Sequence, residues 1–74
     1  MRTYKEIKLQ DWARYVATDK DGKTYQYDRE PYKEIHEGVW RKRNFINHRM
    51  QVVIDTGVLC EDWEDSLVEL PLNY

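Results

Sequence analysis

The chain has 74 residues, of which 35% are charged and 41% hydrophobic, and its formal net charge is −2. This length predicts a single small domain spanning residues 1–74, which buries roughly 60–65% of its unfolded surface on folding. The longest apolar runs are three residues, far short of the ~20 that a spanning helix needs, so we expect a cytoplasmic protein without a membrane span or a secretory leader.

Charge is divided unevenly along the chain. All twelve Lys and Arg lie at or before Arg49, whereas residues 51–74 carry six carboxylates and no basic side chain. Such a division favours either pairing of the two halves within the fold or a charged surface that meets a partner. The basic half and the acidic half are therefore two candidate surfaces.

The N-terminal segment does not select one structure. Leu9, Trp12 and Val16 fit helical spacing, but the segment leads directly into a strand-like run. The pattern allows a short turn of helix at most, and residues 3–12 stay open between helix, strand and loop.

A hairpin is predicted next. Residues 14–18 and 23–27 are rich in β-branched and aromatic side chains, and Asp19-Lys20-Asp21-Gly22 lies between them. An Asp-Gly turn between two such runs is a strong hairpin signal, because Gly tolerates positive φ. Pro31 follows the second run and is expected to end it, since proline lacks the amide that the ladder needs.

A second hairpin is predicted from residues 38–46 and 50–55. Hydrophobic and polar side chains alternate in both runs, and residues 47–49 form a plausible turn between them. In this arrangement the boundary between basic and acidic residues falls in the middle of a hairpin, which places Lys42, Arg43 and Arg49 near Asp55 and the acids that follow.

A short helix is predicted over residues 61–70. Trp63, Leu67 and Leu70 fall at i, i+4 and i+7, and acids gather in the first turn, where the helix dipole favours them. Asp62 is a candidate cap, and Pro71 is expected to stop the helix.

These elements predict an α+β, mainly β domain, in which two antiparallel hairpins form a small twisted sheet with one short C-terminal helix. One short helix covers only part of one sheet face, so either the N-terminal segment or a second copy of the chain covers more, and a homodimer is one expected outcome. The predicted core consists of Val16, Tyr25, Tyr27, Trp40, Ile46, Val52, Ile54, Trp63 and Leu67.

No catalytic or metal motif is recognised. The acids of the Asp19-to-Gly22 turn resemble part of a calcium loop, but strands flank them and the first ligand position is not acidic. His36, His48 and Cys60 are twelve residues apart, which gives no close ligand pair for zinc. Cys60 lies in an apolar run beside two acids, which indicates a buried structural thiol. We expect no metal, no cofactor and no enzymatic activity.

The basic segment is a candidate nucleic-acid site, because cations neutralise phosphates and aromatic rings stack on bases. A binding module of this kind is usually basic overall, with pI above about 9, whereas this chain has pI ≈ 5.6. The residues of this alternative are Trp40, Arg41, Lys42, Arg43 and Arg49.

The acidic segment has three interpretations. It pairs with basic residues of the same molecule, binds a basic protein surface, or imitates nucleic-acid phosphates on a small scale. Internal pairing combined with a modest partner surface is the interpretation that we favour. The partner-binding candidates are Glu61, Asp62, Trp63, Glu64 and Asp65.

Aromatic and acidic residues spread along most of the chain form the pattern Asp11-Trp12-Ala13-x-Tyr15-Val16-Ala17-x-Asp19-x-Asp21-Gly22-x-x-Tyr25, then Pro31, Trp40 and Asp62-Trp63-x-x-Ser66-Leu67. This pattern resembles small proteins encoded by bacteriophages and prophages, which generally have no assigned biochemical function. The resemblance implies an accessory protein in a bacterial cytoplasm. We therefore expect a non-enzymatic protein that binds a host or phage protein, with nucleic-acid binding as the alternative.

Overall fold

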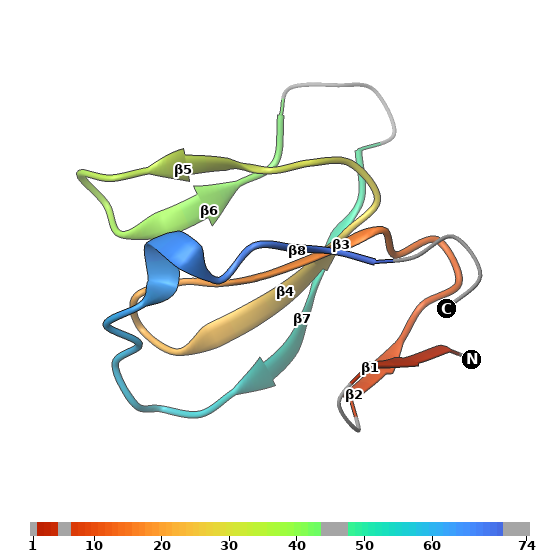
Figure 1. The fold of residues 1–74 in the computed structure, drawn as a ribbon, viewed down its shortest axis with the longest axis horizontal. Coiled ribbons are helices and arrows are strands. Elements are labelled where there is room, and N and C mark those ends of the chain that lie inside the picture. The colour runs from red at the N-terminus through yellow and green to blue at the C-terminus, as the bar shows by residue number, and fades with distance from the viewer. Residues whose placement is uncertain (1, 5–6, 44–47, 71–74) are drawn as a thin grey trace.

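A computed structural model describes residues 2–4, 7–43 and 48–70 (Figure 1). In these ranges the chain is mainly β, as predicted, and no helix is long and apolar enough to cross a membrane. The elements are β1 (Arg2–Tyr4), β2 (Ile7–Leu9), β3 (Tyr15–Thr18), β4 (Lys23–Tyr27), β5 (Tyr32–Glu34), β6 (Val39–Arg41), β7 (Met50–Asp55), the 3-10 turn η1 (Trp63–Asp65) and β8 (Val68–Glu69).

The central sheet has four antiparallel strands in the order β7-β4-β3-β8. Its β3–β4 pair is the predicted first hairpin, which is confirmed with Tyr15 opposite Tyr27 and Thr18 opposite Thr24. Gly22 in the connecting turn has φ +93°, and a Cβ there would lie 2.3 Å from the backbone oxygen of Val58. The turn therefore needs glycine both for its conformation and for its close contact with the loop after β7.

The predicted second hairpin is wrong in its pairing. β6 pairs with β5, whereas β7 pairs with β4. The physical reason is a tight turn at residues 35–38, where Gly38 has φ +70° and its N–H donates to Glu34 O at 2.9 Å. This turn folds β6 back on β5 and leaves β7 free to join the sheet. Residues 44–47, which include Ile46, lie outside the described ranges.

The predicted C-terminal helix is not confirmed, because a single 3-10 turn and the two-residue strand β8 take its place. β3 and the residue before it supply hydrogen-bond partners that a helix would otherwise supply from within itself. Ser66 Oγ accepts from Thr18 N at 2.9 Å, and Leu70 N donates to Arg14 O at 2.7 Å. Asp62 precedes η1 but its side chain makes no capping bond. Tertiary pairing with β3 thus overrides the local helical spacing.

Buried side chains form two clusters on opposite faces of the sheet. On one face, Leu9 and Ala13 from the N-terminal segment pack with Val16 and Leu70. On the other face, Ala17 and Tyr27 of the sheet pack with Trp40 and Trp63. Trp40 belongs to β6 and Trp63 to η1, so the β5–β6 hairpin and η1 (Figure 1) cover this face. The sequence allowed either the N-terminal segment or a second copy of the chain to cover more of the sheet. In the structure the N-terminal segment covers part of the first face.

The predicted core is confirmed in its aromatic centre. Val16, Tyr27, Trp40 and Trp63 are at most 5% exposed. Tyr25 and Leu67 are half-buried against the cluster that contains Tyr27, Trp40 and Trp63. The prediction is wrong for Val52 and Ile54, which are 51% and 44% exposed. Both lie on β7, which is at the edge of the sheet, so packing covers only part of each side chain.

Candidate interaction surfaces

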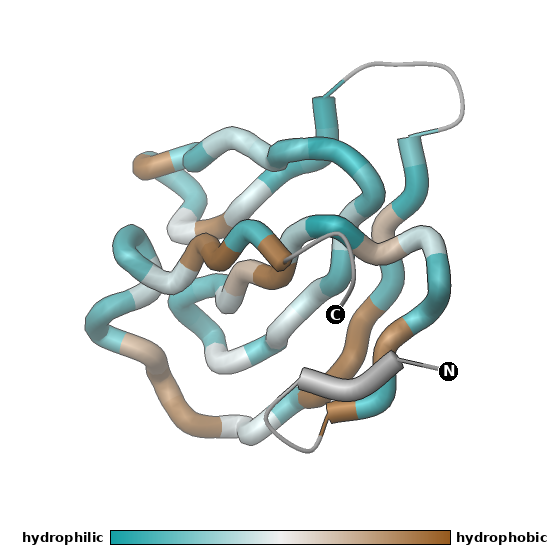
Figure 2. Tube along the Cα trace, turned by 45° about the vertical axis from the view of Figure 1, so that its right-hand side comes forward, coloured by the Kyte–Doolittle hydropathy of each residue, from teal (hydrophilic) through white to brown (hydrophobic). Residues whose placement is uncertain are grey.

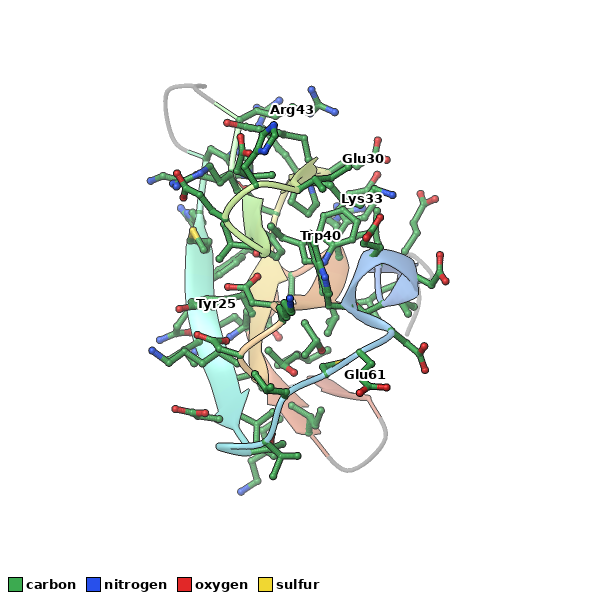
Figure 3. The ribbon with its side chains drawn as sticks, turned by 90° about the vertical axis from the view of Figure 1, so that its left-hand side faces the viewer. Tyr25, Glu30, Lys33, Trp40, Arg43 and Glu61 are labelled. Atoms are coloured by element: carbon green, nitrogen blue, oxygen red, sulfur yellow. The ribbon has the colours of Figure 1, made fainter. Side chains whose placement is uncertain are left out.

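The acidic surface consists of Glu61, Asp62, Glu64 and Asp65, all of which are exposed (Figure 3, Glu61 labelled). These residues lie on η1 and the turn before it. Asp65 N donates to Asp62 O at 3.0 Å, which closes the turn and keeps the four carboxylates within one short segment. The predicted partner-binding carboxylates are therefore brought together at the surface.

Trp63 lies beneath this surface, 5% exposed, and does not present its ring to solvent. The indole N–H of Trp40 donates to Trp63 O at 3.0 Å, and the two ring centroids are 6.3 Å apart in an edge-to-face arrangement. Such aromatic pairs contribute about 0.5–1.5 kcal/mol beyond the area that they bury. Of the predicted partner-binding residues, Trp63 thus anchors the acidic surface rather than forming part of it.

Glu64 of the acidic surface pairs with a basic residue from the first half of the chain, Lys33. The Glu64 carboxylate lies 3.7 Å from Lys33 Nζ, and both side chains are about half exposed. An exposed pair of this kind contributes about 0–1 kcal/mol. Arg43 donates instead to Glu30 O at 3.0 Å, and the backbone N–H of Arg49 donates to Asp28 Oδ1 at 2.8 Å. These two basic residues are thus bound to groups other than the acids expected from the sequence.

An apolar segment adjoins the acidic surface along the chain. Val58 and Leu59 are 67% and 69% exposed and directly precede Cys60 and Glu61. Cys60 is half-buried, and its N–H donates to Lys20 O at 2.8 Å. Figure 2 shows this hydrophobic stretch of the loop after β7 in brown, followed by the hydrophilic turn. The structure therefore places two exposed aliphatic side chains next to four exposed carboxylates.

The basic segment has a different environment. Arg41 pairs with Glu37 on the β5–β6 hairpin, and the Arg43 guanidinium lies 5.9 Å from the centroid of the Tyr32 ring. Lys42 is exposed. Trp40 is 5% exposed with its N–H already donated, so its ring is not accessible for stacking on a base. The exposed cations of this segment thus lack the aromatic contribution expected from Trp40.

The Arg49 side chain contacts a different part of the chain from Arg41 and Arg43. It precedes β7, and its guanidinium lies 5.9 Å from the centroid of the Trp12 ring. A cation over an indole face is stabilised by about 0.5–1 kcal/mol at an exposed site. Arg49 therefore contacts the N-terminal segment through its side chain.

The Asp19–Gly22 turn is structural. Asp19 is 5% exposed, and its Oδ1 accepts from Trp40 N at 2.8 Å, while Asp21 Oδ1 accepts from Lys23 N at 3.0 Å. Burial raises the pKa of Asp19 above its usual 3.8, and the hydrogen bond from Trp40 opposes that rise. Both acids are thus used by the backbone of this region.

Within residues 2–4, 7–43 and 48–70, no group of three or more His, Cys, Asp or Glu residues is arranged to hold a metal ion. The three candidates for zinc, His36, His48 and Cys60, belong to no such group. The His48 ring is buried, and its Nδ1 lies 2.8 Å from Arg43 O. That contact joins a residue shortly after β6 to a residue shortly before β7.

One pocket was missed by the sequence analysis. It has a volume of about 770 Å³ and is open to solvent, and burial, with Glu69 and Glu30 nearby, raises the pKa of the Tyr15 hydroxyl on its wall. The lining residues are Trp12, Arg14, Tyr15, Asp28, Arg29, Glu30, Glu69 and Leu70. Three carboxylates and two guanidinium groups surround two aromatic rings, a mixture that selects no single class of ligand. The aromatic residues that flank Arg14 were the available sequence signal.

Comparison with known proteins gives no relative from which a role could be transferred: no protein-family model, curated protein or solved structure matches this chain.

Proposed function

We propose that this chain is a non-enzymatic accessory protein of the phage type, which acts in a bacterial cytoplasm by binding another protein. The observation that supports the proposal best is the exposed segment 58–65, in which two aliphatic side chains adjoin the acidic surface. Exposed apolar residues rimmed by charge are typical of protein-binding sites.

The chemistry of this segment defines its partner. Four carboxylates attract a basic surface and steer the encounter, an effect that weakens as salt shortens the Debye length from about 10 Å at 0.1 M to about 3 Å at 1 M. Val58 and Leu59 supply the apolar contact, since burying such a side chain contributes about 1.5–3 kcal/mol. The partner is therefore a host or phage protein with a basic surface around a small apolar depression.

The arrangement of the core supports this assignment of roles. Trp63 is buried between the carboxylates on either side of it and is held by Trp40, so η1 is fixed before any partner arrives. A surface that is ordered in advance avoids part of the entropy cost of binding. The acidic surface thus meets its partner with its backbone already in place.

The test is affinity capture from an expressing bacterium with the wild-type chain and a fourfold variant, Glu61→Lys, Asp62→Lys, Glu64→Lys and Asp65→Lys. We expect the variant to lose the captured protein while its circular dichroism and tryptophan fluorescence stay those of the folded chain, because the four side chains are exposed.

A control with the same change in net charge reverses four exposed acids elsewhere: Asp11, Glu30, Glu37 and Glu69. This control should keep the captured protein. If both variants lose it equally, net charge rather than the acidic surface determines capture; if both keep it, the acidic surface has no part in binding.

A further inference from the structure

We draw no further inference here: the strongest candidate, the exposed edge of strand β7 in the central sheet, has no strand paired with its outer side within the described ranges, and nothing in the structure shows what covers it.

Discussion

The contact between Asp19 and Trp40 joins the β3–β4 hairpin to the β5–β6 hairpin. Asp19 is 5% exposed, and its Oδ1 accepts the Trp40 backbone N–H at 2.8 Å. The substitution Asp19→Ala removes the acceptor and leaves a buried donor without it, which costs about 1–3 kcal/mol. Asp19→Asn keeps an amide oxygen in the same place. We therefore expect the alanine variant to be about 1–3 kcal/mol less stable than the asparagine variant.

The same contact predicts how stability depends on pH. Burial raises the folded-state pKa of Asp19 above its usual 3.8, so the folded chain binds this proton more tightly than the unfolded chain does. The stability associated with this protonation is fully present below pH 3.8 and is lost as pH rises through the raised pKa. Asp19→Asn has no such proton, so its stability relative to the wild type should increase as pH rises from 3.8 toward neutrality.

Urea unfolding followed by tryptophan fluorescence measures both effects, because Trp40 and Trp63 are buried. The free energy of unfolding of the wild type and both variants is compared in a pH series that begins below the ordinary pKa of 3.8 and ends at about neutrality. Two results would refute the reasoning: equal stability of the alanine and asparagine variants, or a wild-type minus asparagine difference that does not change with pH.

Three further predictions concern the turn, the core and the basic segment. Gly22→Ala should destabilise the chain by more than the ~1 kcal/mol expected for backbone strain alone, because the new Cβ would lie 2.3 Å from a backbone oxygen. Gly57→Ala should show only the cost of the strain, because its Cβ would have no atom within 4 Å. Thermal unfolding measures both variants. Trp63→Ala should cost about 3–5 kcal/mol in urea unfolding, against less than about 0.5 kcal/mol for the exposed Leu59→Ala; similar losses would place Trp63 outside the core. Mobility-shift assays at low ionic strength should show no retarded DNA or RNA, and retardation that disappears when Arg41–Arg43 are replaced by Gln would favour the nucleic-acid alternative.

The sequence predicted the elements whose signals are local. The β3–β4 hairpin follows from the Asp-Gly turn, and the buried state of Trp40 and Trp63 follows from the size of their side chains. Alternation also identified β7 as a strand. Each of these conclusions needs only residues that lie close together in the chain.

Pairing and surface placement depend on contacts between distant residues, and these were not predicted. Hydrophobic and polar side chains alternate in both β6 and β7, but this alternation does not identify the neighbour of either strand. The turn at Gly38 determines that β6 pairs with β5. The spacing of Trp63 and Leu67 is compatible with a helix, and only the hydrogen bond between Ser66 and Thr18 of β3 shows that this segment pairs with the sheet instead. The acidic surface was predicted from composition, whereas the adjoining exposure of Val58 and Leu59 required the fold, because an apolar run alone indicates burial as readily as exposure.

Site-specific photo-cross-linking in living bacteria tests most directly the claim that residues 58–65 bind another protein. A photoreactive amino acid replaces Leu59, and a matched chain carries it at Ile35, which is similarly exposed, at 62% against 69%. The account predicts that irradiation joins a protein other than this chain itself to position 59 and not to position 35, and that 1 M salt during irradiation of a lysate reduces the yield. Equal cross-linking at both positions, or none at position 59, would contradict it.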